Sequence, residues 1–441
     1  MKDANPLLAA WELVRDASAD RVAVEEVQTG RRWRFAELDA AAGALTAGEG
    51  EEWRLPGGFS VAIIWETLRA WRDGAVLCPL ERPDRDRTLL PHGAELPAGT
   101  CHVKLTSGST GGPRLVAFSA DALAADARKI VATMGLRPEW PNLGVISMAH
   151  SYGFSNLVLP LLLHGIPLVW LGDPLPGAVA KRLGKLPEGG EGWTLPAVPA
   201  MWRVWHESGI LGGAPIRRAI SAGAPLPVEL ERAIHATSGL KVHNFYGSSE
   251  CGGIAYDRSD EPRVAADFAG TAMAETDLAV DEDGCLTVCG PSVALGYVPD
   301  DGTDRLARGM FRTSDLARLE AGAVWLTGRS DDVINVAGRK VSPAGVERAL
   351  TNLPGLTQVL VFGIASADPV RGEEIVAVLN VPGSETDGEV IERARWLAGQ
   401  ALPTHERPRH WWRSADLAPD ARGKLSRHRW RRLFQERCAT G

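Results

Sequence analysis

A turn rich in glycine and hydroxyl side chains, residues 105–114, limits most strongly what this chain can fold into. It reads Leu-Thr-Ser-Gly-Ser-Thr-Gly-Gly-Pro-Arg, follows an apolar run at 101–105 and precedes a helix-like segment at 119–134. Glycines without a Cβ let the backbone close around an anion, hydroxyls add donors, and arginine offers a fork-shaped cation suited to phosphate. A flexible linker has a similar composition, but the ordered flanks favour a phosphate-binding loop.

This loop differs from the P-loop of kinases and GTPases. That motif requires Gly-Lys-Ser/Thr after four free positions from its first glycine, whereas here Gly108 is followed by Gly112, Pro113 and Arg114. Proline has no backbone N–H and would disturb the helix start that a P-loop needs. The stretch therefore indicates another class of phosphate site.

The composition indicates an ordinary globular protein of more than one domain. The 441 residues carry 48 basic and 55 acidic side chains, a net charge of −7, which gives no reason to expect a nucleic-acid partner. The longest apolar stretch, 157–171, is interrupted by two prolines, a histidine and a glycine, so no membrane span is expected. The N-terminus lacks the apolar core of a signal peptide, and the six cysteines are scattered. We expect a cytoplasmic protein with reduced thiols.

Strand-like and helix-like segments alternate along most of the chain. A buried strand is predicted at 59–65, a helix behind it at 66–74 and a further strand at 76–80. This rhythm is typical of a layered α/β fold. Short alternating strands at 263–326 predict a small β subdomain.

The last part of the chain predicts a separate α+β unit. Strands are expected at 359–363 and 375–380, and a helix at 387–402. The fold class we predict is α/β, with a large N-terminal domain of layered α/β subdomains plus a small β subdomain, residues 1–330. A small, mobile α+β C-terminal domain follows at 331–441.

A second motif, 242–250, reads Val-His-Asn-Phe-Tyr-Gly-Ser-Ser-Glu. Tyr246 ends a predicted strand and could stack on a purine, and the next glycine lets the backbone turn. Ser249 offers a hydroxyl to a phosphate oxygen, and Glu250 can hold a hard cation. The small residues of Ile-Ser-Ala-Gly-Ala-Pro-Leu, 220–226, admit a flat ligand. Each residue alone also suits an ordinary strand and turn, but the set does not.

Three more motifs follow in the C-terminal part. They are Phe-Arg-Thr-Ser-Asp-Leu at 311–316, a segment beginning Gly-Arg-Ser-Asp-Asp at 328–343, and Arg-Gly-Lys-Leu-Ser-Arg at 422–427. In order and spacing, the motifs resemble those of the adenylate-forming (AMP-binding) superfamily, which includes acyl- and aryl-CoA synthetases, adenylation domains of peptide synthetases, and luciferases. The part of the chain before the phosphate loop looks shortened relative to that superfamily.

The resemblance implies an ATP site and a catalytic set. The implied ATP-binding residues are Thr106, Ser107, Gly108, Ser109, Thr110, Gly111, Arg114, Gly223, Ala224, Asn244, Tyr246, Gly247, Asp315 and Arg329. Asn244 and Tyr246 would flank the adenine, and Asp315 and Arg329 would contact the ribose. The implied catalytic residues are Lys424, Glu250, Ser249 and His150, and Asp331 would be a hinge.

The implied reaction explains this choice of residues. A carboxylate attacks the α-phosphorus of ATP, and one pair of like charges at about 4 Å costs about 4 kcal/mol at an effective dielectric constant near 20. Lys424 would place a cation between them, Ser249 would contact the α-phosphate, and Glu250 would be the Mg²⁺ ligand. The acyl group would then pass to a thiol, either coenzyme A or the phosphopantetheine of a carrier protein. Arg339, Lys340 and the basic tail suit an acidic carrier.

The sequence indicates the chemical class of the carboxylic acid substrate. Histidine in apolar surroundings is usually a core residue, but by resemblance His150 borders the substrate carboxylate. Residues 150–156 contain no acidic side chain, and domains for α-amino acids usually carry an aspartate there. This absence and the apolar stretch 150–171 favour an aryl or medium-chain acyl acid.

Two alternatives of other kinds remain open at this point. A catalytically silent nucleotide-binding homologue, acting as scaffold or sensor, is suggested by Arg114 in place of lysine, Ser249 in place of threonine and Ser314 in place of glycine. The charged groups of the reaction are nevertheless all present. A ligase that closes a β-lactone from a β-hydroxy acid would need no thiol.

Overall fold

The computed structural model describes residues 5–43, 52–81, 83–86, 95–106, 114–300, 302–337, 339–366, 372–419 and 425–440. The chain divides into two compact units, which we describe separately. Unit 1 consists of Met1–Ala279, Thr287–Arg312 and Leu319–Val324, and unit 2 of Val280–Leu286, Thr313–Arg318 and Trp325–Gly441. The predicted domain boundary between residues 330 and 331 stays a prediction.

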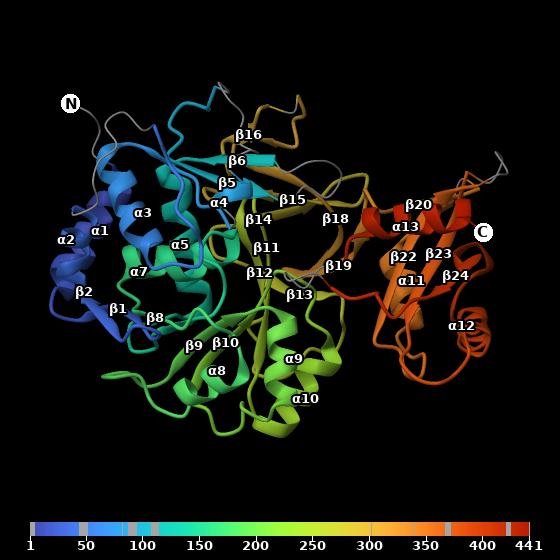
Figure 1. Ribbon diagram of the computed structural model, residues 1–441. Coiled ribbons are helices and arrows are strands. Elements are labelled where there is room, and N and C mark those ends of the chain that lie inside the picture. The colour runs from blue at the N-terminus through green and yellow to red at the C-terminus, as the bar shows by residue number, and fades with distance from the viewer. Residues whose placement is uncertain are drawn as a thin grey trace. The chain divides into compact units, whose positions relative to one another are not determined.

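A large mixed sheet forms the centre of unit 1 (Figure 1). Its strands run in the order β13-β12-β11-β10-β9-β7-β8-β1-β2. Their bounds are β1 (Val22–Glu26), β2 (Arg31–Arg34), β7 (Asn142–Gly144), β8 (Leu168–Trp170), β9 (Trp193–Ala197), β10 (Ile216–Ser221), β11 (Val242–Ser248), β12 (Gly252–Tyr256) and β13 (Phe268–Ala272). β9, β10 and β11 are parallel neighbours, so their carboxyl ends share one edge.

Unit 1 also contains a set of helices. They are α1 (Pro6–Ser18), α2 (Phe35–Gly43), α3 (Ala62–Asp73), α4 (Pro83–Asp86), α5 (Ala120–Met134), α6 (Ser151–Gly153), α7 (Leu159–His164), α8 (Pro176–Leu183), α9 (Pro199–Glu207) and α10 (Val228–Ser238), with a π-helical segment η2 (Phe154–Val158) between α6 and α7. Helix α5 begins where the Ser119 side chain caps the backbone N–H of Ala122 and ends at Gly135, whose φ of 62° is left-handed. Figure 1 shows α8, α9 and α10 beside β9 and β10.

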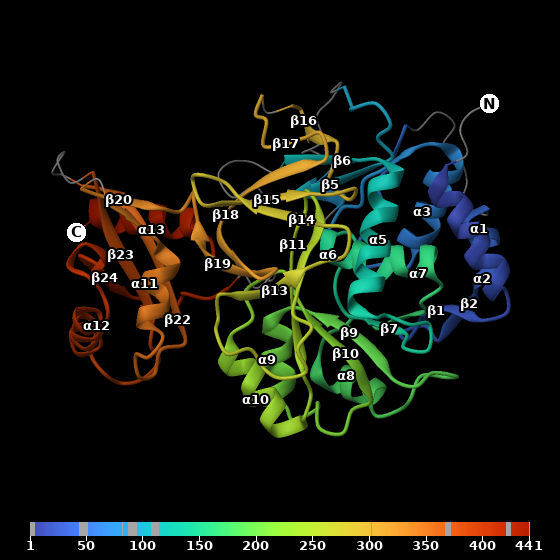
Figure 2. The same cartoon turned by 180° about the vertical axis from the view of Figure 1, so that it is seen from behind.

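A second, smaller sheet of unit 1 carries the ends of the predicted phosphate loop (Figure 2). Its order is β16-β6-β5-β4-β3, with β3 (Trp53–Arg54), β4 (Val76–Leu77), β5 (His102–Thr106), β6 (Arg114–Phe118) and β16 (Gly296–Val298). β5 and β6 are antiparallel. The loop therefore joins two strands, and helix α5 follows only after β6.

The strand predicted at 59–65 is wrong, because residues 62–73 form helix α3. Ile64, Leu68 and Trp71 are all buried, and their spacing places them on one helical face. Gly74, with a φ of 71°, ends the helix in the left-handed conformation. The helix predicted at 66–74 is thus the second half of a longer one.

Unit 2 contains the predicted α+β arrangement. Its C-terminal elements are β20 (Ile334–Val336), β21 (Arg339–Val341), α11 (Pro343–Leu350), β22 (Gln358–Ala365), β23 (Glu373–Asn380), α12 (Asp387–Ala401), a 3₁₀ turn η3 (Thr404–Glu406), β24 (His410–Arg413) and α13 (Arg427–Thr440). β22 pairs antiparallel with β23, and β23 pairs parallel with β24. The predicted strands and helix here are confirmed, and so is the α/β fold class as a whole.

The remaining strands lie between residues 277 and 329. They are β14 (Asp277–Val280), β15 (Cys285–Cys289), β17 (Leu306–Ala307), β18 (Met310–Glu320) and β19 (Ala323–Arg329). They fulfil the prediction of alternating strands in this region. In the part of the chain that the structure describes, no helix is both long and apolar enough to cross a membrane.

Candidate functional site

The two ends of the predicted phosphate loop lie side by side. Thr106, the last residue of β5, pairs with Arg114, the first residue of β6, and the Thr106 hydroxyl donates to the Arg114 carbonyl at 3.2 Å. Ser107, Gly108, Ser109, Thr110 and Gly111 lie outside the described residues. The strand pairing closes the stem of the loop, and seven residues, 107–113, connect it.

Several predicted adenine-site residues meet at the carboxyl edge of β10 and β11. Ser221 at the end of β10 is paired in register with Asn244 of β11. The chain after Ser221 turns at Gly223, whose φ of 85° favours glycine, and continues to Ala224. The Asn244 amide is held because its Nδ2 donates to the Ala269 carbonyl at 3.0 Å.

Strand β11 continues past Tyr246 into a tight turn. Tyr246 is half-buried, and a Cβ at Gly247 would lie 2.6 Å from the Gly252 carbonyl, so only glycine fits. The register of β10 and β11 therefore brings Gly223, Ala224, Asn244, Tyr246 and Gly247 to one edge, as a nucleotide site would require.

Ser249 and Glu250 occupy the turn between β11 and β12. The Ser248 hydroxyl accepts from the Glu250 backbone N–H at 3.2 Å, which fixes the turn. The Glu250 carboxylate accepts at Oε1 from the Tyr297 hydroxyl at 3.1 Å. Burial raises the pKa of the neighbouring Cys251 thiol to about 11, so this cysteine is not a ready nucleophile. Ser249 is half-buried beside Glu250.

His150 caps the short helix α6. Its Nδ1 accepts from the Tyr152 backbone N–H at 3.3 Å, so the neutral ring carries its proton on Nε2. The Tyr152 hydroxyl donates to the Ile220 carbonyl at 3.1 Å, immediately before Ser221. This bond joins the His150 segment to the same sheet edge, and nothing in the sequence had pointed to Tyr152.

Gly153 lets the chain pass close to its own earlier turn. A Cβ at this position would lie 2.0 Å from the Ser147 carbonyl. The close approach therefore holds helix α6 against the segment at Ser147 that precedes His150.

In unit 2, Arg329 contacts both Asp315 and Asp331 directly. Arg329 binds Asp331 through two hydrogen bonds of 3.1 Å and donates to Asp315 Oδ1 at 3.0 Å. Burial is the largest single influence on the pKa of Arg329 and lowers it, but the two carboxylates together outweigh burial and raise this pKa. Arg329 in turn lowers the pKa of Asp331, although burial of that carboxylate acts in the opposite direction. Lys424 lies outside the described residues.

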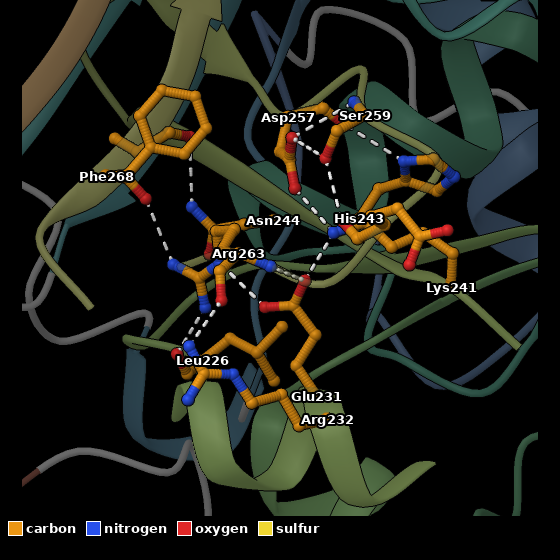
Figure 3. Close-up of polar contacts among 12 residues, drawn as sticks. Leu226, Glu231, Arg232, Lys241, His243, Asn244, Asp257, Ser259, Arg263 and Phe268 are labelled. Carbon is orange, nitrogen blue, oxygen red and sulfur yellow. Dashed lines mark hydrogen bonds and ion pairs between the residues drawn. The ribbon is translucent and has the colours of Figure 1, made fainter. Parts of the chain in front are cut away.

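A buried network of charges supports the edge of the sheet in unit 1 (Figure 3), and no sequence motif indicates it. Glu231 of α10 accepts from the Lys241 ammonium and from Arg263 Nε at 2.7 Å. Lys241 also donates to Asp257 at 2.6 Å. Arg263 then donates to the Leu226 carbonyl at 2.5 Å, at the end of the turn that holds Gly223.

The donor set suits Mg²⁺ carried by a nucleotide. Among the described residues no group of three or more His, Cys, Asp and Glu side chains could hold a metal by itself. Mg²⁺ usually binds through one or two carboxylates together with substrate phosphates, and keeps several waters. Glu250, a carboxylate on a turn beside the nucleotide edge, fits that mode.

The chain is an α/β protein, and residues predicted to bind a nucleotide lie at the carboxyl ends of its parallel strands. Residues 70–298 match the family model of the AMP-binding enzymes, and the chain belongs to that family.

Relatives and solved structures agree with this assignment. The salicylyl-CoA synthase / salicylate adenylyltransferase of a Streptomyces species is 30% identical over 66% of this chain and 55% of its own length. A probable 2-succinylbenzoate–CoA ligase of Mycobacterium tuberculosis is 28% identical over 80% of this chain and 91% of its own. ATP-bound MatB from Rhodopseudomonas palustris shares the fold, with a TM-score of 0.83, 20% identity and coverage of 97% of this chain and 99% of its own. The chain thus spans about half the length of the first of these relatives and nearly all of the other two.

Proposed function

We propose that this protein uses ATP to activate a carboxylic acid as its acyl-adenylate and then transfers the acyl group to a thiol. The observation that carries the proposal is the register of Ser221 with Asn244, which brings two motifs, 220–226 and 242–250, to one edge of the sheet in a chain of the AMP-binding family. The thiol would be coenzyme A or a carrier-protein phosphopantetheine.

The residues of unit 1 would bind the nucleotide and the acid. Asn244 and Tyr246 would flank the adenine, and the loop that begins at Thr106 and ends at Arg114 would hold the β- and γ-phosphates. Ser249 would donate to the α-phosphate, and His150 would orient the attacking carboxylate. When bound at Glu250, Mg²⁺ would neutralise charge on the phosphates and the departing pyrophosphate.

The residues of unit 2 would contact the ribose and supply the cation. Asp315 would accept from the ribose hydroxyls, with Arg329 holding its carboxylate in place. Lys424 would stand between the substrate carboxylate and the α-phosphate, where a donor of this kind contributes about 10²–10³ in rate.

The contacts of two adjacent aspartates support Asp331 as a hinge. Asp331 is bound by Arg329, on the segment before it, whereas Asp332 accepts from Arg427 of helix α13 at 2.9 Å. Arg427 also binds Glu347 through two hydrogen bonds of 2.7 and 2.8 Å. The side chains of residues 331 and 332 therefore bind different segments of unit 2, as a pivot at this point would favour.

We propose an aryl acid as the substrate class. The relatives named above are a salicylyl-CoA synthase and a probable 2-succinylbenzoate–CoA ligase, and both names denote aromatic acids. The segment after His150 offers no carboxylate to hold an α-ammonium group, and Phe154 and Leu157 behind it are buried and apolar.

Pyrophosphate release with a panel of benzoic, cinnamic, fatty and amino acids, followed by mass spectrometry of trapped adenylates, tests the proposal. We expect release with aryl acids only. ATP binding without turnover of any acid would instead indicate a silent homologue, and a lactone product without thiol would indicate ring closure.

The role of Lys424 has its own test. Lys424→Ala should lower adenylate formation by about 10²–10³ and spare thiolysis of a synthetic acyl-adenylate. Arg429→Ala, which removes an exposed cation from the same basic segment, is the control and should leave both steps unchanged. An equal fall in both half-reactions would contradict the hinge.

A further inference from the structure

A short strand, β16, connects the stem of the phosphate loop to Glu250. β16 pairs antiparallel with β6, and Tyr297 lies opposite Val116, two residues after Arg114. Leu295 N–H extends this pairing by donating to the Ala117 carbonyl at 2.8 Å. Because β6 is the strand that leaves the loop, the position of β16 is fixed relative to the loop stem.

The same segment holds Glu250 at two points. Ala294 N–H donates to the Glu250 backbone carbonyl at 2.9 Å, and the Tyr297 hydroxyl donates to Glu250 Oε1 at 3.1 Å. Ser292, just before it, donates from its hydroxyl to the Cys251 carbonyl at 2.9 Å. With both its backbone and one carboxylate oxygen held, Glu250 has a defined side-chain orientation. Among the described residues no hydrogen bond to its Oε2 is formed, which leaves this oxygen to a cation.

Arg114, the first residue of β6, contacts the ring of Tyr297. Its guanidinium carbon lies 5.3 Å from the centroid of the Tyr297 ring, within the range of a cation–π contact. A planar guanidinium stacks on an aromatic ring better than an ammonium does. The contact gives a physical reason for an arginine at this position of the loop.

We propose that Tyr297 is a positioning residue that orients the Glu250 carboxylate toward nucleotide-bound Mg²⁺ and couples it to the strand that leaves the phosphate loop. This inference rests on the proposed function. Outer residues that orient a metal ligand typically change metal affinity by 10- to 100-fold when they are altered. No motif in the sequence indicates a role for Tyr297.

Calorimetric titration of the full-length protein with ATP, once with saturating Mg²⁺ and once in EDTA, tests the proposal. We expect Tyr297→Phe to weaken binding about tenfold with Mg²⁺ and to leave binding in EDTA unchanged. Tyr256→Phe is the matched control, because it removes the same hydroxyl group from a buried tyrosine whose ring stacks on His243 and not on Arg114. It should bind ATP as the parent protein does in both buffers.

A double-mutant cycle shows whether the effect passes through Glu250. In a Glu250→Gln background, Tyr297→Phe should add less than about twofold, because the pair is coupled. Equal weakening in both buffers, or no weakening with Mg²⁺, would overturn the role of Tyr297 while leaving the proposed function intact. Absence of any Mg²⁺-dependent ATP binding by the parent protein would overturn both.

Discussion

Replacing Glu231 by glutamine should destabilise unit 1 strongly, although the two side chains have nearly the same shape. Glu231 is completely buried, and its two oxygens accept from the Lys241 ammonium, from the Arg263 backbone N–H at 2.9 Å and from Arg263 Nε at 2.7 Å. Asp257 provides the second negative charge, so two cations face two carboxylates. Glutamine leaves this buried set with one uncompensated positive charge.

The size of the effect follows from that imbalance. Removing one partner of a buried ion pair costs about 3–5 kcal/mol, because the remaining charge stays desolvated. The glutamine amide can still accept at one oxygen, but its NH₂ group then faces a guanidinium or an ammonium. We therefore expect the free energy of unfolding of unit 1 to fall by about 3–5 kcal/mol.

Equilibrium urea unfolding, followed by tryptophan fluorescence, measures this change. Glu229→Gln is the matched control, since Glu229 lies on the same helix but is exposed, and its effect should stay within about 0.5 kcal/mol. Glu231→Gln should also weaken ATP binding, because Glu231 binds Arg263, and Arg263 in turn holds the Leu226 carbonyl beside the turn at Gly223. If Glu231→Gln lowers the stability by less than about 1 kcal/mol, the buried charges are not balanced as described.

Three further predictions concern stability in unit 1. Burial lowers the pKa of His243 from 6.5 to about 4, so between these pH values the unfolded chain binds more protons and the free energy of unfolding should fall as the pH falls. In urea unfolding, His243→Asn should remove this loss of stability, which reaches up to about 3 kcal/mol at pH 4. An unchanged dependence of stability on pH would contradict the prediction. Lys104→Met should raise the free energy of unfolding by about 1–4 kcal/mol, because the buried ammonium has no hydrogen-bond partner among the described residues. A lower free energy of unfolding would instead show that the ammonium makes a stabilising contact. Gly252→Ala should cost about 2–4 kcal/mol more than the φ-matched Gly239→Ala, since its Cβ would meet Asp126 at 2.0 Å, and equal thermal shifts of the two variants would refute the clash.

Much of the fold could be predicted from the sequence, but short apolar runs could not. The run at 59–65 contains Ile63, Ile64 and Trp65, and a run of this length fits a buried strand as well as a buried helix. What decides for the helix is a face that continues to Trp71 and a left-handed glycine after it. Strand β6 was missed for a related reason, because it starts directly after Pro113 and merges with the loop in the sequence.

The candidate site was predictable as a set of motifs and not as a geometry. Each motif shows which chemistry its residues offer, but the pairing of Ser221 with Asn244 depends on which strands are neighbours. The contact of Arg329 with Asp315 likewise joins residues that the sequence separates by a hairpin. A residue that acts by orienting another side chain, as proposed for Tyr297 and Glu250, lies in no recognisable sequence motif.

The buried charges of unit 1 link the stability of the fold to the shape of the nucleotide edge. The Arg263 guanidinium donates to Glu231 and to the carbonyls of Leu226 and Phe268, so it connects the turn after β10 with the start of β13. Lys241 begins the segment that becomes β11 and carries Asn244. Because the same ion pairs hold both sides of the proposed adenine site, a change in this network should weaken nucleotide binding even where the chain stays folded. An apolar replacement of equal volume could keep the stability, but it would release the backbone carbonyls that Arg263 now holds in place.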